Sequence, residues 1–139
     1  MKLVMVINQE LPLGLIANTA AVLGLSVGDR VTGLTGPDIT DGAGRIHAGI
    51  TKVNIPVLGA SSMVLEGLYE RLMEESVGVS DSDIQIIDFN TVAQRCKNYD
   101  DYTRELAACG LDAFEYLGLC LYGPEQKINR LTGNLRLLR

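Results

Sequence analysis

The chain has 139 residues and a mass of 15.0 kDa, and 47% of its residues are hydrophobic, so we expect one domain over residues 1–139 with a substantial core. Intrinsic disorder and a second domain of full size are excluded. The 12 Lys and Arg against 17 Asp and Glu give a net charge of −5, which excludes broad non-specific binding to nucleic-acid backbones or anionic lipid.

The cysteines do not form a metal-binding or redox motif. Cys96, Cys109 and Cys120 are too widely spaced for a zinc knuckle or a C-x-x-C pair, so we expect three reduced thiols in a cytoplasmic protein. His47 is the only histidine, and its apolar neighbours are typical of the start of a strand. We therefore expect no metal ion and no cofactor. No run approaches the roughly 20 apolar residues of a membrane span, so we expect no membrane contact.

The first quarter of the chain predicts a strand and a helix. Residues 3–7 form a continuous apolar run rich in Val and Ile, which is typical of a strand covered on both faces. After a turn with Pro and Gly, residues 15–23 are almost entirely apolar, which predicts a helix buried on most sides. Gly24 and Gly28 then end this helix. The glycine-rich stretch up to residue 49 predicts a mobile loop, with a lid over a site as one role.

A second strand and a second helix follow. Apolar residues alternate over residues 50–58, which predicts a strand, and Pro56 indicates an edge position or the end of pairing. Ser61 and Ser62 can cap a helix that reaches residue 75. Its buried stripe consists of Leu65, Leu68 and Leu72.

The rest of the chain predicts two more strands between helices. A strand over residues 84–87 ends at Asp88, and Thr91 with Gln94 has the spacing of a capping box, so a helix begins there. Asn98 indicates a break or a second cap. The helical stripe beyond it, which Gly110 closes, consists of Tyr99, Tyr102, Leu106 and Cys109.

The C-terminal part alternates in the same way. A strand over residues 114–122 precedes a short helix from Pro124 to Leu131, and residues 135–138 form a last strand or a docked tail. Strands and helices therefore alternate along the whole chain. This order predicts an α/β fold, a single three-layer sandwich around a small mixed sheet.

Two segments resemble the peptidyl-tRNA hydrolase II family. The first segment is the opening strand, turn and helix over residues 2–7 and 14–21. The second segment, which is the more specific of the two, is the C-terminal one, with Gly123-Pro124, Ile128-Asn129, Leu131-Thr132-Gly133 and Leu135-Arg136-Leu137. The resemblance implies that family's fold. The sequence is also similar to an uncharacterised bacterial family of that fold, a domain of unknown function, in the stretches Leu11-Pro12, Ala17-Asn18-Thr19-Ala20 and Asp88-Phe89.

The sequence departs from the hydrolase family where that family carries its cation. Leu15 stands in place of a lysine, Thr19 in place of a glutamine and Val22 in place of a histidine. Leucine cannot replace the charge or the hydrogen bonds of lysine. The resemblance matches the family's aspartate to Asp88 and a threonine to Thr91, and so implies these two as the catalytic residues of any surviving activity.

Polar residues near the predicted strand ends form the candidate site. Asp88 either acts as a general base or ligand-binding carboxylate, or caps the helix near residue 91. Asn18 and Thr19 either tie their helix to a neighbouring loop or face a pocket beside Asn8 and Glu10. Both alternatives require these side chains to be hydrogen-bonded.

Positive charge gathers near the C-terminus, in Lys127, Arg130 and Arg136. A solvated surface is the usual explanation, and a weak contact with tRNA is the alternative.

The leading function hypothesis is a module that binds a small ligand or a partner, with a cleft lined by Asn8, Glu10, Asn18, Thr19 and Asp88. The alternative is a divergent hydrolase that cleaves an ester or amide such as peptidyl-tRNA. These hypotheses differ in whether a replacement cation, Lys52 or Arg45, enters the cleft. A third hypothesis is a structural role in which the apolar first helix forms a homodimer face.

Overall fold

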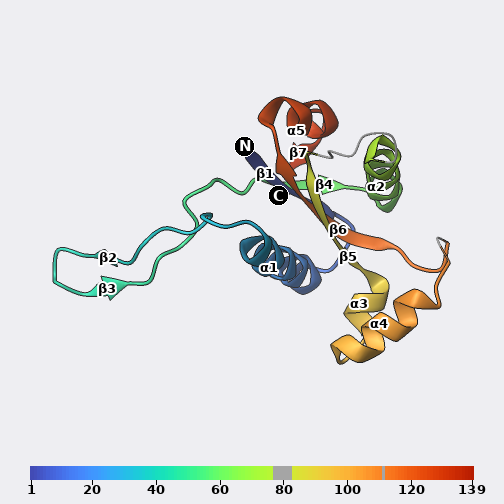
Figure 1. Cartoon of the computed structure of the whole chain (residues 1–139), viewed down its shortest axis with the longest axis horizontal. Helices are drawn as coiled ribbons and strands as arrows, with labels where there is room; N and C mark the ends of the chain where they lie inside the picture. The colour runs from blue at the N-terminus through green and yellow to red at the C-terminus, as the bar shows by residue number, and fades with distance from the viewer. Residues whose placement is uncertain (77–82, 111) are drawn as a thin grey trace.

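The computed structural model describes residues 1–76, 83–110 and 112–139 (Figure 1). Its elements are, in chain order, β1 (Lys2–Asn8), α1 (Leu13–Arg30), β2 (Ile39–Thr40), β3 (Ile46–His47), β4 (Val57–Ala60), α2 (Ser62–Ser76), β5 (Gln85–Asn90), α3 (Thr91–Arg95), α4 (Tyr99–Ala107), β6 (Tyr116–Gly123), α5 (Glu125–Thr132) and β7 (Arg136–Leu137).

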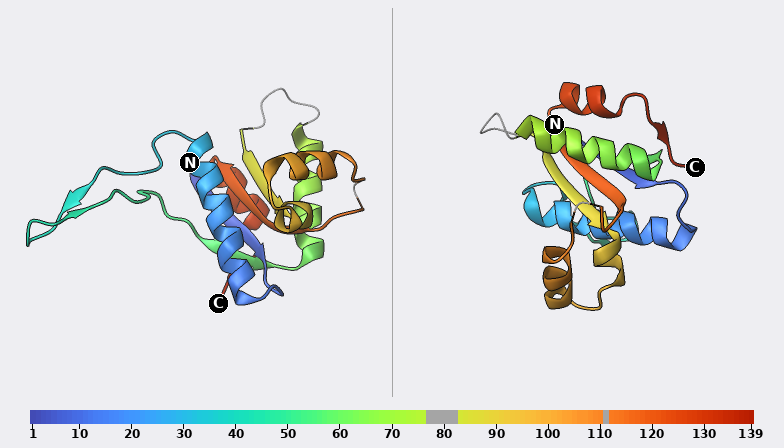
Figure 2. Two further views of the ribbon diagram at one scale, coloured as in Figure 1. Left: turned by 90° about the horizontal axis from the view of Figure 1, so that it is seen from below. Right: turned by 90° about the vertical axis from the view of Figure 1, so that its right-hand side faces the viewer.

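Five strands form a mixed sheet in the order β5-β6-β1-β4-β7. The central strand β1 is parallel to β4 and antiparallel to β6, and the other two pairs are antiparallel. Helices α2 and α5 cover one face of this sheet, and α1 covers the other (Figure 2). The prediction of an α/β fold around a mixed sheet is confirmed.

Two core layers fill the space between the sheet and its helices. On the α2 side, Leu65, Leu68 and Leu72 are buried against the even-numbered residues Val4 and Val6 of β1. On the α1 side, buried side chains of the helix meet the odd-numbered residues of β1, such as Met5. Strand β1 is therefore buried on both faces, as predicted, and the predicted stripe of α2 is confirmed. Ser61 caps α2, since its Oγ accepts from the N–H of Val64 at 3.2 Å.

Helix α1 is longer and less buried than predicted. It continues through Gly24 and Gly28 to Arg30, and only Thr19, Leu23 and Val27 are buried. These three residues are four apart, so they lie on one face of the helix. A Cβ on Gly24 would lie 3.6 Å from Met5 Cε, so this glycine faces the sheet inside the helix instead of ending it.

Residues 32–56 form an arm instead of a loop followed by a strand. The arm projects from the body and carries the small hairpin β2-β3 near its tip (Figure 1). Its two limbs are joined by backbone hydrogen bonds such as Gly36 N–H to Ile50 O at 2.9 Å. The strand predicted over residues 50–58 begins only at Val57, the first residue that pairs with β1, so its first seven residues are wrong. Of the two alternatives for Pro56, the edge position is wrong, because β4 lies between β1 and β7, and the end of pairing is confirmed, because pairing starts directly after this residue.

The segment around Asp88 also differs from the prediction. Strand β5 continues to Asn90, so Asp88 lies inside the strand and does not end it. Asn90, not Thr91, is the N-cap of α3, since its Oδ1 accepts from the N–H of Ala93 at 3.0 Å. Thr91 is the first residue of the helix, so the predicted capping box is wrong. The second cap is confirmed, because Asn98 Oδ1 accepts from the N–H of Asp101.

The last elements deviate only at their ends. Helix α4 ends at Ala107, so Cys109 and Gly110 lie beyond it, and none of its residues is fully buried. Strand β6 begins at Tyr116, two residues after the predicted start. Pro124 is the N-cap of α5 rather than its first residue, and β7 keeps only two residues of the predicted tail strand.

Candidate functional site

A cavity of about 520 Å³ lies between α1, β5 and the α3-α4 segment, within the size range of small-molecule sites. We call it the Asp88 pocket. Its lining comes from one side of α1 (Val22, Ser26 and Arg30), from β5 (Ile86, Ile87, Asp88 and Phe89) and from the α3-α4 segment (Ala93, Cys96, Lys97, Asn98, Tyr99 and Tyr102). No residue of the arm belongs to this lining.

Asp88 has one carboxylate oxygen bound and one free. Asn90 Nδ2 donates to Asp88 Oδ2 at 2.8 Å, and the same nitrogen lies 3.5 Å from the Tyr102 hydroxyl. Asn90 is fully buried and its Oδ1 caps α3, so this amide is fixed at both ends. Asp88 Oδ1 has no hydrogen-bond partner among the described residues. Asp88 itself does not cap a helix, and its free oxygen can accept from a ligand or a water molecule.

Two cations line the same pocket. Arg30 ends α1, and Lys97 lies between α3 and α4. Neither makes an ion pair or side-chain hydrogen bond within the part of the chain that the structure describes. With Asp88, the lining has two positive charges and one negative charge. Such a lining favours a ligand with an anionic group.

Three tyrosines lie near Asp88. The rings of Tyr69 and Tyr116 stack with centroids 4.5 Å apart, beside a second cavity of about 550 Å³. Burial, and next the negative charge of Asp88, raise the pKa of Tyr69. Burial also raises the pKa of Tyr102 and of Tyr116. These phenols are therefore protonated at neutral pH, so each hydroxyl can donate a hydrogen bond to a ligand and does not act as a base.

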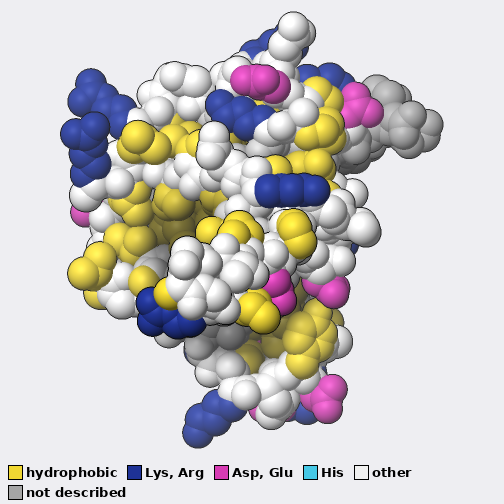
Figure 3. Space-filling view, turned by 90° about the vertical axis from the view of Figure 1, so that its left-hand side faces the viewer, with side chains coloured by type: hydrophobic (Ala, Val, Ile, Leu, Met, Phe, Trp, Pro, Cys, Tyr) yellow, Lys and Arg dark blue, Asp and Glu magenta, His cyan; other side chains and the backbone are white. Residues whose placement is uncertain are grey.

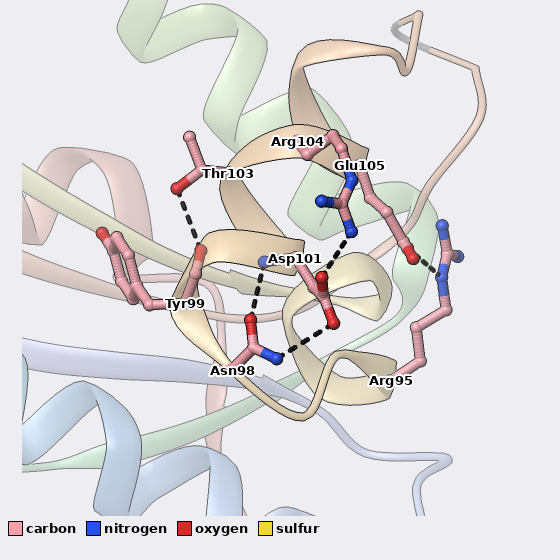
Figure 4. A network of polar contacts seen from close by, with 7 residues as sticks. All are labelled: Arg95, Asn98, Tyr99, Asp101, Thr103, Arg104 and Glu105. Carbon is pink, nitrogen blue, oxygen red and sulfur yellow. Dashed lines mark hydrogen bonds and ion pairs between the residues drawn. The ribbon is translucent and has the colours of Figure 1, made fainter.

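Polar contacts hold the α3-α4 segment in place (Figure 4). Arg95 Nε donates to Glu105 Oε2 at 3.0 Å and so joins the two helices. Asn98 Nδ2 donates to Asp101 Oδ2 at 3.0 Å, and Arg104 also contacts Asp101. The hydrogen bond from Arg95 lowers the pKa of Glu105. The network fixes the ends of the turn that carries Lys97.

Cys96 is not an activated nucleophile. Burial, and next its hydrogen bond to Glu105, raise the pKa of this thiol, so the reactive thiolate is disfavoured. All three cysteines are free thiols, as predicted. His47 lies in β3 on the arm, where its Nε2 is 2.8 Å from Asp41 Oδ2, and it does not line the Asp88 pocket.

The other ligand-binding residues predicted from the sequence do not line the Asp88 pocket. Asn8 ends β1, two strands away from β5, and its Oδ1 accepts from the N–H of Glu10 at 3.0 Å. Glu10 and Asn18 are exposed. Thr19 is fully buried, and its hydroxyl donates to Leu15 O of the same helix at 2.7 Å. Of the predicted cleft, only Asp88 lies in this cavity.

The exposure of Asn18 explains why the cleft predicted from the sequence differs from the Asp88 pocket. Both alternatives for Asn18 required a hydrogen bond, but its side chain has none with the described residues. Because α1 is buried along one stripe only, Asn18 faces solvent. The expectation of a bonded amide at this position is therefore wrong, whereas for Thr19 it is confirmed.

Thr91 and the predicted cations lie elsewhere. Thr91 Oγ1 accepts from the N–H of Glu115 at 3.1 Å and joins α3 to the start of β6. Arg45 and Lys52 are exposed on the arm, and neither lines the Asp88 pocket. Arg30 and Lys97 provide positive charge there instead. They come from two distant segments without a shared motif, so no signal in the sequence joins them to Asp88.

The basic residues near the C-terminus are divided among different contacts. Lys127 Nζ lies 2.6 Å from Asp83 Oδ2, which neutralises part of this charge. Arg130 lies beside Arg71 in a shallow cavity between α2 and α5, and Arg136 is exposed on β7.

The described residues lack two further kinds of feature, a metal-binding cluster and a membrane-spanning helix. No group of three or more His, Cys, Asp or Glu side chains is arranged to hold a metal ion there. None of the helices described has the length and apolar character needed to cross a lipid bilayer.

Comparisons with known proteins agree with the fold. The family model described as "Protein of unknown function (DUF2000)" matches residues 1–139. No curated protein matches the sequence. Among solved structures, the chain is similar to Atu0240, a protein of unknown function from Agrobacterium tumefaciens strain C58, with a TM-score of 0.83 and 16% identity over 98% of this chain and 96% of that chain. At this identity the similarity shows the fold alone.

Proposed function

The chain belongs to the DUF2000 family, whose description names no activity. From the residues of the chain itself, we propose that the protein binds a small organic anion that also carries a hydroxyl or amino group. One observation carries this proposal. Arg30, Lys97 and the free Oδ1 of Asp88 line one cavity of about 520 Å³ and have no partners there among the described residues. Unpaired charges in one cavity are typical of a binding site.

Each part of the lining has a role in this proposal. Arg30 and Lys97 bind the phosphate or carboxylate group of the ligand, since charge-assisted hydrogen bonds to such groups are strong. Asp88 accepts a hydrogen bond from the hydroxyl or amino group. Phe89 and Tyr102 provide apolar surface for the body of the ligand.

Thermal shift with a panel of amino acids, hydroxy acids and sugar phosphates tests the proposal. A ligand at 100 times its Kd stabilises the folded state by about 2.7 kcal/mol, so a true ligand raises Tm measurably. Binding of that ligand is then measured by titration calorimetry. We expect Lys97→Gln and Asp88→Asn to weaken binding at least about tenfold, which is roughly 1.4 kcal/mol.

Matched controls separate the pocket from general charge effects. Lys52→Gln removes a cation from the arm, and Asp112→Asn removes an exposed carboxylate outside the pocket. Both should bind the ligand as the unchanged protein does. A ligand that binds all four variants equally, or a panel without a single ligand, would contradict the proposal.

A second candidate function, hydrolysis of an ester or amide such as peptidyl-tRNA, has one observation in its favour. Arg30 and Lys97 can stabilise a developing oxyanion where Leu15 cannot, and the free oxygen of Asp88 can activate a water molecule. In this function Thr91 would stabilise the helix that follows the base. Arg130 and Arg136 are the exposed cations available for the tRNA backbone.

Hydrolysis of an N-blocked aminoacyl-tRNA tests this second candidate. Removal of a general base costs about 10²- to 10⁴-fold in rate, so Asp88→Asn should abolish turnover while the protein stays folded. Turnover that Asp88→Asn leaves intact would mean a different catalytic base. No turnover would leave ligand binding as the proposed function.

A further inference from the structure

The arm exposes hydrophobic residues far from the body. Ile39, Ile46 and Ile50 are 64%, 73% and 74% exposed, and all three belong to the arm. The hairpin β2-β3 has only two residues in each strand, and a two-stranded hairpin alone in water is marginally stable. Figures 1 and 2 show the arm projecting away from the sheet and its helices. An arm with this composition needs a surface to cover it.

The whole chain also exposes more surface than a compact monomer of its mass. The accessible surface is 9167 Å². A compact monomer of this mass exposes about 7,000 Å² by the usual scaling of area with mass. The excess, roughly 2,000 Å², is larger than the approximately 800 Å² that each partner contributes to a standard interface.

The body carries an apolar surface beside the base of the arm. We call it the tail face; it consists of Leu13, Leu15 and Ile16 at the start of α1, Val53 and Ile55 at the base of the arm, and Leu138 near the C-terminus. Leu13 is exposed and the other five are half-buried against the core on the α1 side. Figure 3, seen with the arm toward the viewer, shows hydrophobic side chains around a hollow on this side of the molecule.

The charges of the arm indicate what kind of partner it fits. Asp38, Asp41, Arg45 and Lys52 sum to zero. Arg45 and His47 contact Asp41, and the N–H of Gly49 donates to Asp38 at 2.9 Å, so three of the four charged side chains are engaged within the arm. A neutral arm with exposed isoleucines fits an apolar protein surface and does not fit a nucleic acid.

We propose that this partner is a second copy of the chain, and that two copies exchange arms across a two-fold axis. Each arm lies on the tail face of the other copy. Every copy carries both surfaces, so a closed dimer covers both arms and both tail faces at once. The exchange is independent of the Asp88 pocket, to which the arm contributes no residue.

Sedimentation equilibrium at tens of micromolar tests the exchange. We expect a mass of about 30 kDa, twice the 15.0 kDa of one chain. The arm variant, Ile39→Asp with Ile46→Asp, should sediment as a monomer with an unchanged circular dichroism spectrum. The face variant, Leu13→Glu, should also be monomeric, and an acid in the first turn of α1 is compatible with the helix.

The matched control is Met63→Glu, which places the same acid in the first turn of α2 at an equally exposed position, 82% for both residues. It should remain dimeric. Mixing the arm variant with the face variant should restore a heterodimer, because one intact arm then meets one intact tail face. A monomeric unchanged protein, an open-ended oligomer, or a dimer insensitive to the arm variant would overturn the arm exchange.

Discussion

At the residue scale, Gly118 of β6 shows how closely α1 packs on the sheet. A Cβ at this position would lie 2.7 Å from Thr19 Cγ2 and 3.3 Å from Val6 O. We therefore expect Gly118→Ala to lower the free energy of unfolding by about 1–3 kcal/mol, as overpacked cores do. Thr19→Ser removes the methyl group but keeps the hydroxyl that donates to Leu15, so it should recover part of the loss in the double variant. Urea unfolding measures all three variants.

Gly28 provides the control for this prediction. A Cβ on Gly28 meets nothing within 4 Å, and the residue lies inside α1. Gly28→Ala should raise the free energy of unfolding by about 0.5–1 kcal/mol, because alanine is the better helix former. If both alanine variants changed stability in the same direction, close packing at Gly118 would not be the reason.

Ionisation of the tyrosines near Asp88 predicts the behaviour of the protein in alkali. The folded state raises the pKa of Tyr69, Tyr102 and Tyr116 above the ordinary value of 10.0. Their contribution to stability is thus complete below pH 10 and is lost as pH rises through the folded-state values. We expect the free energy of unfolding to fall above pH 10, and Tyr116→Phe to reduce that fall.

Asp88→Asn extends the same prediction. The charge of Asp88 contributes to the raised pKa of all three tyrosines, so the asparagine variant should ionise them at lower pH. Ultraviolet absorbance of the phenolate at increasing pH measures this shift. An unchanged titration would show that Asp88 is too well solvated to affect these rings.

At the element scale, α1 has one buried face, and two of its leucines test this. Leu23 is 0% exposed and Leu25 is 80% exposed. Leu23→Ala should cost about 2–5 kcal/mol in the free energy of unfolding, whereas Leu25→Ala should change it by less than about 0.5 kcal/mol. Chemical denaturation of both variants at the same protein concentration measures the difference. Comparable losses would restore the prediction of a helix buried on most sides.

The same helix explains which elements the sequence could predict. Continuous or periodic apolar residues predicted β1 and α2 well, because burial alone decides both patterns. Gly24 suggested an end to α1, but it packs against Met5 inside the helix. Val53 and Ile55 alternate like a strand, yet they pack at the base of the arm without pairing with the sheet. Periodicity shows which side chains are buried, but it cannot show whether the backbone of a segment pairs with a neighbouring strand.

The candidate site was predicted less completely than the fold. Asp88 was predicted from its place after the apolar part of a strand and, chiefly, from the resemblance to the hydrolase family, whereas its partner Asn90 was not predicted. Arg30 and Lys97 are 67 residues apart and belong to no motif, so only the folded chain brings them into one lining. Thr91 was found as a candidate, and its hydroxyl accepts from the backbone of Glu115.

At the scale of the whole molecule, the sheet centre and the arm should differ most in hydrogen exchange. Strand β1 is paired on both sides by β4 and β6, and its residues Val4 and Val6 are buried, so these amides should exchange only on global unfolding. The hydrogen bonds near the tip of the arm, such as Asp41 N–H to Arg45 O, join residues that are half-buried or exposed in one copy. In the proposed dimer they are covered by the second copy. Protection of the arm should therefore increase with protein concentration, whereas protection of β1 should not.

Hydrogen exchange measured by mass spectrometry at 1 and 100 micromolar protein compares the arm with β1. Protection of the arm that does not depend on protein concentration would contradict the exchange of arms between two copies.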